Sequence, residues 1–344
     1  MATRWRTYLS KGMTMTAFTA FRIHQDAAHH RAGLEALRLD QLSPGEVTVR
    51  VEWSAINYKD ALAVTGRGKI LRHSPLVGGA DAAGRVEAST DPSLPVGTRV
   101  VVTGGGLGEV CDGGFAPYLR VPAALVIPLP EGLSTRQAMV IGTAGFTAAL
   151  ALARMEQNGQ TPDLGPILVT GASGGVGSFT TALCARQGYE VAALTLKPAS
   201  IDYLQALGAC KVILRDGLAM GQRALETARF GGVIEVLGGE YLGWAIRCVR
   251  PHGNVAVIGM ATGTDFRTSV MPFILRGVNL LGINSVDVPR GQREQIWSRL
   301  ARDLDATQLD HICAGEITLD ELPAFCGEML AGHVHGRTLV RVGG

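Results

Sequence analysis

The sequence lacks closely spaced cysteines. Its six cysteines lie far apart, and no two of them form a Cys-x-x-Cys pair: Cys111, Cys184, Cys210, Cys248, Cys313 and Cys326. Disulfide frameworks and structural zinc sites depend on such pairs, so the spacing argues against both. His333 and His335 form a His-x-His, but no cysteine or carboxylate cluster accompanies them. We therefore expect no metal, and a location in the reducing cytoplasm.

An excess of charge of one sign is also missing. The chain has 32 lysines and arginines against 30 aspartates and glutamates, a net charge of +2. This balance argues against a nucleic acid or a membrane surface as partner. The longest weakly polar stretch, residues 137–153, contains Gly142, Thr143, Gly145 and Thr147 and is short for a membrane span. It predicts a buried turn and helix.

The first fourteen residues carry three basic side chains but neither an apolar core segment nor a cleavage site. A secretory signal is therefore not expected. We predict that residues 1–14 are a disordered N-terminal extension and that Met13 or Met15 is the natural start. The total of 344 residues, with 47% hydrophobic residues and 45 glycines, suits two domains of a soluble α/β protein.

The part that follows the extension has a β pattern. Residues 47–53 alternate apolar and polar side chains after a Ser-Pro-Gly-Glu turn signal, as a half-buried strand does. Further strands are expected at 83–87, 98–102 and 118–121. Short strands between glycines and prolines favour a compact, barrel-like domain. Helical and strand patterns then alternate from about Glu131 to Gly282, followed by a helix at 297–304 and a strand at 337–342.

A glycine-rich turn organises the middle of the chain. The apolar run 166–170 enters a glycine cluster, and a helical pattern follows the cluster. Glycine lets the backbone approach a pyrophosphate closely, and the amino end of the helix attracts its charge. Ala172, Gly174 and Gly177 take the three places of the fingerprint G-x-G-x-x-G. The alternative is a glycine turn of another α/β protein, but the β-like run Tyr189–Leu196 favours a nucleotide-binding βαβ unit.

The end of that second strand predicts the cofactor. NAD-binding units normally place Asp or Glu here to accept hydrogen bonds from the ribose 2′-hydroxyl. This chain has Thr195, Leu196 and Lys197 instead, so no carboxylate repels a 2′-phosphate. Lys197 can pair with that phosphate and Thr195 can donate a hydrogen bond, which predicts NADPH. The alternative is that Lys197 is an ordinary solvated lysine at the end of a strand.

Two later segments fit the same domain. Residues 232–238 and 253–259 are apolar, strand-like runs that each end in glycine. Ligands of open α/β sheets bind just outside such carboxyl ends. Each segment alone is equally consistent with plain core, but in this order the two runs are what a six-stranded dinucleotide-binding sheet requires.

Five motifs occur in order along the chain: Asn57-Tyr58-Lys59-Asp60, Ile141–Ala148, the glycine turn, Val270–Arg276 and Gly336–Val340. With this set the chain resembles the acrylyl-CoA reductase and YhdH-type quinone oxidoreductase branch of the zinc-free medium-chain dehydrogenases/reductases. The resemblance implies an α/β protein with a β-rich GroES-like catalytic domain at residues 15–138 and 284–344. It also implies a Rossmann domain with a doubly wound parallel sheet at 139–283, NADPH as the hydride donor, and a homodimer.

The residues argue against zinc. A catalytic zinc of this superfamily would use a cysteine where Asn57 stands and a His-Glu pair where Ala80 and Asp81 stand, and neither Asn nor Ala can replace those ligands. A site without metal does not readily ionise an alcohol, but it can reduce a C=C bond conjugated to a carbonyl. Hydride then goes to the β-carbon, and hydrogen-bond donors stabilise the enolate.

The resemblance also assigns site residues. Tyr58 is expected to orient the nicotinamide or donate to the enolate oxygen, Asn57 to supply an amide contact, and Asp60 to anchor the loop. From the residues alone, a tyrosine on a turn after a strand more often serves packing. Thr143 is expected near the nicotinamide ribose and Arg215 near the adenine. The full set of expected cofactor contacts is Tyr58, Thr143, Ser173, Gly174, Gly175, Val176, Gly177, Thr195, Leu196, Lys197, Arg215, Ile258 and Gly259.

Two segments are expected to contact the substrate. The run Arg67–His73 carries three formal positive charges that could meet the phosphates of a CoA thioester, although a solvated basic loop is an equal alternative. The stretch Gly104–Gly114 resembles the family loop at the cleft, where relatives carry an aromatic residue in place of Gly105 and a His-Trp pair in place of Cys111 and Asp112. The smaller residues here imply a smaller, more acidic pocket wall. The expected substrate contacts are Arg67, Lys69, Arg72, Gly105 and Cys111.

Together these expectations describe an enzyme with a small-molecule substrate. The first is NADPH-dependent reduction of a short enoyl thioester such as acrylyl-CoA. The alternatives are a quinone or an α,β-unsaturated ketone or aldehyde reductase, which could serve a biosynthetic pathway, and a non-catalytic NADPH-binding sensor.

Overall fold

The computed structural model describes residues 17–26 and 29–342, and the predicted extension 1–14 lies outside them. The chain divides into two compact units. The first contains the residues up to Thr143, Pro289–Glu294 and the segment from Gly315 onward, and the second contains Ala144–Val288 and Gln295–Ala314. The predicted boundaries place 295–314 in the catalytic domain, whereas this segment clusters with the second unit.

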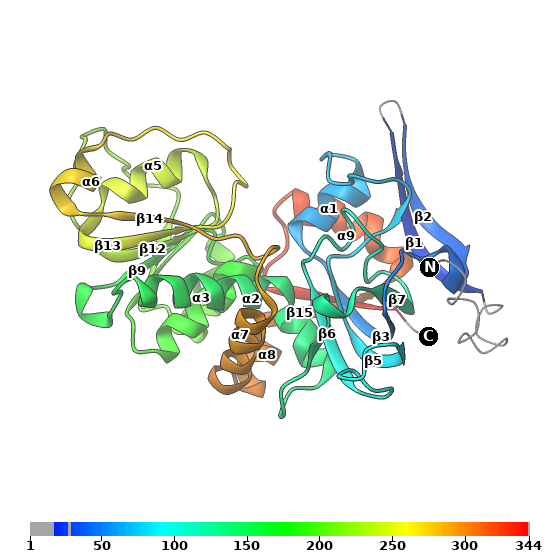
Figure 1. Ribbon diagram of the computed structural model, residues 1–344. Helices are drawn as coiled ribbons and strands as arrows, with labels where there is room; N and C mark the ends of the chain where they lie inside the picture. Colours follow the sequence, from blue (N-terminus) through cyan, green and yellow to red (C-terminus); the bar gives the residue numbers. More distant parts are fainter. Residues whose placement is uncertain (1–16, 27–28, 343–344) are drawn as a thin grey trace. The chain divides into compact units, whose positions relative to one another are not determined.

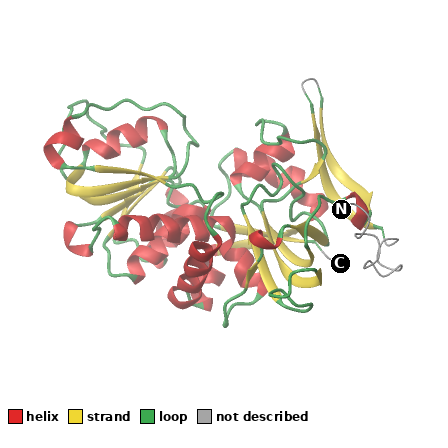
Figure 2. Cartoon of the chain, in the orientation of Figure 1, coloured by secondary structure: helices red, strands yellow, loops and turns green. Residues whose placement is uncertain are grey.

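The first unit is built on β strands (Figures 1 and 2). Its larger sheet has the order β15-β16-β3-β5-β6-β8, with β7 paired to β3. Their bounds are β3 Val47–Ala55, β5 Asp81–Ser89, β6 Arg99–Thr103, β7 Tyr118–Val121, β8 Ile127–Pro128, β15 Cys313–Thr318 and β16 Arg337–Arg341. A smaller sheet has the order β2-β1-β4, from β1 Phe18–Gln25, β2 His30–Leu37 and β4 Leu76–Val77. The strands predicted at 47–53, 83–87, 98–102 and 118–121 are confirmed.

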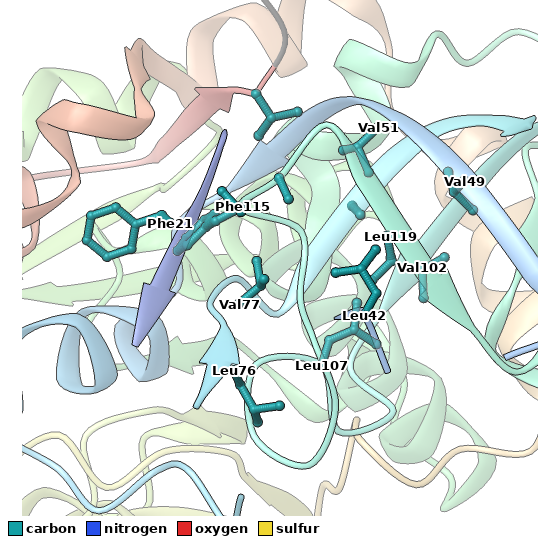
Figure 3. Packing of buried hydrophobic residues seen from close by; sticks show 14 of the residues in the cluster. Phe21, Leu42, Val49, Val51, Leu76, Val77, Val102, Leu107, Phe115 and Leu119 are labelled. Atoms are coloured by element: carbon teal, nitrogen blue, oxygen red, sulfur yellow. The ribbon is translucent and has the colours of Figure 1, made fainter. Parts of the chain in front are cut away.

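The core of this unit follows from the alternation seen in the sequence. Val47, Val49 and Val51 of β3 point to one face and are buried. Val49 and Val51 belong to a hydrophobic cluster that also contains Phe21, Leu107 and Phe115, all of which are labelled in Figure 3. A β strand exposes alternate side chains to opposite faces, so one apolar face suffices to form this core.

Two helices of the first unit pack against each other, α1 (Tyr58–Thr65) and α9 (Leu322–Leu330) (Figure 1). Helix α1 begins with a capping box, in which Asn57 is the N-cap and Asp60 is the third residue. It ends at Gly66, whose φ of 67° lies in the left-handed region that glycine adopts without strain. The cap therefore fixes where the Asn57-Tyr58 motif leaves β3.

The second unit contains a six-stranded parallel sheet of order β11-β10-β9-β12-β13-β14 (Figure 2). Its strands are β9 Ile167–Val169, β10 Val191–Thr195, β11 Lys211–Leu214, β12 Phe230–Glu235, β13 Val249–Val257 and β14 Asn279–Gly282. Helices α3 (Gly175–Arg186) and α5 (Gly239–Arg247) cover opposite faces of it (Figure 1). This is the predicted doubly wound sheet, in which the order reverses beside β9.

The remaining helices are α2 Thr135–Gln157, α4 Ile201–Ala206, α6 Met271–Arg276, α7 Arg290–Asp303 and α8 Ala306–Ile312. Helix α2 has the length and hydropathy of a membrane span, but 83% of its most apolar window is buried, as in a core helix. It is interrupted at Gly142, with φ 47° and ψ −156°. The expectation of a buried turn and helix at 137–153 is therefore confirmed.

Candidate active site

The glycine turn lies between β9 and α3. Gly171 has a φ of 58°, and Gly174 is the N-cap of α3. A Cβ at Gly177 would lie 2.4 Å from the Gly171 oxygen and 2.5 Å from the Ala172 Cα, so no side chain fits there. The third glycine of the fingerprint thus lets the helix start pack directly on the turn, and the start of a helix offers backbone N–H groups of the kind that can bind a pyrophosphate.

The end of β10 lies beside this turn. The Thr195 hydroxyl is buried and lies 3.0 Å from the Ser173 hydroxyl, and it accepts a hydrogen bond from the Lys197 backbone N–H at 3.1 Å. Leu196 is exposed, and burial lowers the pKa of the half-buried Lys197. Ser173 and Thr195 therefore brace the turn against the strand end, which bears a lysine and no carboxylate.

Arg215 lies at the end of the neighbouring strand β11. Its backbone N–H donates to the Thr195 carbonyl at 3.1 Å. The guanidinium donates to Glu240 at 3.2 Å and lies over the Tyr241 ring, 5.4 Å from its centroid. The structure thus brings Lys197 and Arg215 to adjacent strand ends, with part of the Arg215 charge compensated by Glu240.

The ends of β12 and β13 are held by a residue that the sequence analysis missed. Glu235 is fully buried and accepts hydrogen bonds from the Thr170 hydroxyl at 2.9 Å, the Leu237 N–H at 2.9 Å and the Gly238 N–H at 2.8 Å. Burial raises its pKa against the effect of these donors. The Glu235 carbonyl accepts from the Ile258 N–H at 2.9 Å. A carboxylate directly before Val-Leu-Gly-Gly, at the end of an apolar strand, was the available signal.

The first unit has a buried polar centre around Asp81. Its carboxylate, at the start of β5, accepts hydrogen bonds from the Asn57 side chain at 2.9 Å and from the Thr143 N–H and hydroxyl at 2.9 and 2.5 Å. It also accepts from Arg337 Nη2 at 3.3 Å. Four donors converge on one carboxylate, which brings together three of the segments that the sequence motifs marked separately.

Arg337 joins the same segments from the other side. It is buried and donates to the Val140 and Ile56 carbonyls at 3.1 and 2.9 Å and to Asn57 Oδ1 at 2.9 Å. A Cβ at Gly142 would lie 2.5 Å from the Asp81 carboxylate and 2.6 Å from the Arg337 guanidinium. The interruption of α2 therefore needs glycine for its positive φ and for this close approach.

Asp60 completes the centre. It is buried and accepts from the Asn57 N–H at 2.8 Å, the Asn57 side chain at 3.2 Å and the Ala80 N–H at 2.9 Å. Burial and the nearby Asp81 charge raise the pKa of Asp60 to about 6, although its hydrogen bonds oppose the shift. Asp60 thus anchors the Asn57 turn. Tyr58, the next residue, is 47% exposed and belongs to neither apolar cluster.

The residues expected to contact the substrate differ in how exposed they are. Arg67, Lys69 and Arg72 are exposed, and the Arg72 Nε donates to Glu109 at 3.0 Å. Gly105, with φ 60°, faces Leu125, whose side chain would lie 2.6 Å from a Cβ there. Cys111 is half-buried, and burial and the Asp112 charge raise its pKa to about 11, so the thiol stays protonated at neutral pH.

Asp112 corrects one expectation. Its carboxylate is buried and accepts from the Ser43 N–H at 2.7 Å, the Ser43 hydroxyl at 2.9 Å and the Val77 N–H at 2.8 Å. The prediction that Asp112 makes a pocket wall more acidic is therefore wrong. The residue anchors the Gly104–Gly114 loop to the rest of the unit.

Comparisons with known proteins place this geometry in a family. The model of the alcohol dehydrogenase GroES-like domain matches residues 43–131, and that of the zinc-binding dehydrogenases matches 175–302. Acrylyl-CoA reductase AcuI of Ruegeria pomeroyi is 44% identical over 319 residues, which is 92% of this chain and 96% of that protein. The chain belongs to the medium-chain dehydrogenase/reductase superfamily, in the acrylyl-CoA reductase and YhdH-type branch.

Solved structures agree. The YhdH oxidoreductase of Salmonella enterica, in complex with NADP, has a TM-score of 0.91 at 43% identity and covers 94% of this chain and 100% of its own. The Bacillus subtilis protein YhfP, with NAD bound, has a TM-score of 0.91 at 40% identity and covers 95% and 99%. The predicted fold class, the superfamily and the assignment as an oxidoreductase are confirmed, which argues against a purely non-catalytic sensor.

The residues at the Asp81 centre do not have the donors of a zinc site, although the second family model is named for zinc binding. Both hydrogens of the Asn57 amide are donated to carboxylates, its oxygen accepts from Arg337, and Asp81 already accepts four hydrogen bonds. Within residues 17–26 and 29–342 there is no group of three or more His, Cys, Asp or Glu side chains suited to a metal. The donor set around Asp81 does not fit a zinc ion, since a guanidinium and amide hydrogens point at it.

Proposed function

We propose that this member of the superfamily catalyses the NADPH-dependent reduction of a C=C bond conjugated to a carbonyl, without a metal. The first substrate is a short enoyl thioester such as acrylyl-CoA. The observation that carries the proposal is the hydrogen-bonded network of Asp81, Asn57 and Arg337, which occupies the donor atoms of these side chains and fixes the turn that carries the exposed Tyr58. The names of the relatives, an acrylyl-CoA reductase and an NADP complex, support the choice.

The second unit supplies the groups that would hold NADPH, which brings the hydride when it is bound. The N–H groups at the start of α3 are suited to the pyrophosphate. Lys197 and Arg215, at the ends of β10 and β11, supply positive charge for the 2′-phosphate, and the β12 and β13 ends held by Glu235 present Ile258 and Gly259. Ser173 and Thr195 support this site by bracing the turn.

In the first unit, Tyr58 is the proposed catalytic residue. Its phenol hydroxyl donates a hydrogen bond to the substrate carbonyl, where negative charge develops as the enolate forms. Asn57 acts as a positioning residue, because its amide hydrogens are committed to Asp60 and Asp81. The Thr143 hydroxyl donates its proton to Asp81 and can therefore accept a hydrogen bond from the nicotinamide ribose.

The CoA part of the thioester would be recognised by the exposed basic run Arg67–His73. Arg67 and Lys69 carry positive charge that suits the phosphates of CoA. A second candidate function is the reduction of a quinone or an uncharged enone by the same chemistry. It is favoured by the pairing of Arg72 and Lys59 with Glu109, because that pairing lowers the positive charge available to a CoA phosphate.

The proposed assembly is a homodimer in the reducing cytoplasm. Strand β14 is an edge of the parallel sheet and exposes Leu280, and the preceding helix α6 exposes Ile274 and Leu275. An edge strand beside exposed apolar side chains is suited to pair with a second copy. All six cysteines are free thiols. Light scattering should give a dimer mass that falls to a monomer in I274E/L280E and not in V96E, which changes an exposed apolar residue of the first unit.

The function is tested by oxidation of NADPH with acrylyl-CoA, crotonyl-CoA, a simple enone and a benzoquinone in parallel, and with NADH as the paired control. Turnover of a thioester with NADPH and little with NADH supports the whole proposal. If only the enone or the quinone reacts, the second candidate replaces the first. Equal use of NADH would contradict the role given to Lys197.

A further inference from the structure

Glu109 lies between two cations that belong to different segments. Its carboxylate is 2.8 Å from the Lys59 Nζ of α1 and 3.0 Å from the Arg72 Nε of the basic run. The Glu109 side chain is only 19% exposed, whereas that of Arg72 is 73% exposed. Although burial raises it, the two cations hold the pKa of Glu109 below its usual value. Each oxygen of the carboxylate thus has its own cationic partner.

The backbone holds this arrangement independently of the ion pairs. The Arg72 N–H donates to the Glu109 carbonyl at 2.8 Å, and the Glu109 N–H donates to the Gly106 carbonyl at 3.1 Å. The loop is further fixed by the buried Leu107 and Asp112. Neutralising the Glu109 side chain should therefore leave both segments in place.

The basic run is anchored in the same way. Leu71 is buried, and Gln25 donates to the Gly68 carbonyl at 3.3 Å and to the Ser74 hydroxyl oxygen, from its backbone, at 2.8 Å. The intervening Arg67 and Lys69 side chains are left exposed. Substitutions that change a charge near this run should therefore leave its backbone in place.

Around Glu109, cations outnumber carboxylates. Lys59, Arg67, Lys69 and Arg72 are cations, and Glu109 is the carboxylate that pairs with two of them in the described part of the chain. A phosphate that binds Lys59 or Arg72 must replace this carboxylate. The free energy gained from the new ion pair is therefore partly offset by the loss of the existing one. An uncharged substrate meets no such competition.

We propose that Glu109 is a specificity-determining residue, an internal counter-ion that competes with the phosphates of a CoA thioester for Lys59 and Arg72. This inference rests on the proposed reduction of enoyl thioesters and deepens it. Glu109 weakens the binding of the CoA ester and leaves the reaction of thioesters without phosphates unchanged. Glu109 thereby reduces the advantage of CoA esters over small uncharged enones.

The test compares acrylyl-CoA with acryloyl-pantetheine, which has the same thioester and no phosphate, in the wild-type chain and in Glu109→Gln. We expect the KM for acrylyl-CoA to fall about fivefold, with a steeper dependence on salt, since two surface pairs are released. The kinetic constants for acryloyl-pantetheine should stay unchanged. The control is Glu316→Gln, because Glu316 is likewise shared by two arginines, Arg136 and Arg341, in the first unit. It should change neither KM.

A second variant guards against a folding defect in the first. In Arg72→Gln the KM for acrylyl-CoA should rise while acryloyl-pantetheine is unaffected. The inference is overturned if Glu109→Gln leaves the KM for acrylyl-CoA unchanged or raises it, or if both thioesters change alike, which would mean that Glu109 only braces the loop.

The proposed function fails in a different way, namely if the wild-type chain oxidises NADPH with neither thioester nor an enone. Calorimetric titration with free CoA and pantetheine still decides the role of Glu109 in that event. Tighter binding of CoA alone by Glu109→Gln supports the inference, and equal binding by both proteins contradicts it.

Discussion

The residues expected to hold the cofactor in the second unit come from short stretches and are positioned by the backbone, whereas the polar centre of the first unit joins distant segments through side chains. The turn at Gly171–Gly177 needs only one hydroxyl pair, Ser173 and Thr195, to fix it to the next strand. The centre around Asp81 needs residues as far apart as Asn57 and Arg337. The first arrangement tolerates loss of a side chain, and the second does not.

The largest expected effect comes from breaking the side-chain arrangement. Replacing Arg337 by Met leaves the buried Asp81 without its cationic partner, which costs about 3–5 kcal/mol of unfolding free energy. Activity should fall with it, because Arg337 no longer fixes Asn57 and the Asp81 carboxylate to which Asn57 and Thr143 donate. Denaturant unfolding and turnover measure the two effects. Arg341→Met is the matched control: it lies on the same strand, is exposed, and should cost less than about 1 kcal/mol. Similar stability losses in both variants would contradict the account.

A pH titration sharpens the same point. The pKa of Asp60 is raised to about 6 from its ordinary 3.8, so its charged form is disfavoured in the folded state. Above pH 6 this lowers the free energy of unfolding by a constant amount. As the pH falls from 6 towards 4, the folded state binds a proton that the unfolded state does not. The penalty is then relieved, which raises the free energy of unfolding by at most about 3 kcal/mol.

The measurement is the difference in unfolding free energy between the wild type and Asp60→Asn at several pH values. Asparagine cannot accept hydrogen bonds at both side-chain atoms, so the variant should be less stable throughout. The advantage of the wild type should grow between pH 7 and pH 5. A difference that stays flat or shrinks would mean that Asp60 is not held in its charged, disfavoured form.

The smallest effect is expected in the second unit. Lys197→Gln removes one charge at the end of β10 and leaves the turn intact, so the KM for NADPH should rise about tenfold while that for NADH stays the same. Lys211→Gln, at the opposite end of the neighbouring strand, is the control and should change neither. An equal rise in KM for both cofactors would mean that Lys197 does not discriminate between NADPH and NADH.

This contrast also explains what could be predicted from the sequence. The glycine turn and the end of β10 are patterns within some thirty residues, and the alternation of β3 marks its buried face directly, so these elements were predicted correctly. Asn57, Asp60 and Thr143 were each marked by a motif, but nothing local says that they meet on Asp81. Arg337, 256 positions away, completes that centre. Its signal was an arginine at the start of a strand pattern, directly after Gly336.

Other features depend on burial, which a sequence does not state. Asp112 was expected to face a pocket and instead binds Ser43 and Val77 inside the unit. Glu235 was predicted only as part of a strand, but its carboxylate accepts from the Leu237 and Gly238 N–H groups after β12 and from the Thr170 hydroxyl after β9. In both cases a carboxylate found backbone N–H donors that became available only once the chain had folded.

The central claim is that the reduction proceeds without a metal, because the Asn57, Asp81 and Arg337 side chains are committed to one another by hydrogen bonds. It is tested most directly by treating the purified chain with a strong chelator, removing the chelator and bound metal, and measuring NADPH-dependent reduction of acrylyl-CoA and of a simple enone. The account predicts full activity after this treatment and no gain from added zinc. Activity that is lost on chelation and restored by zinc would contradict it.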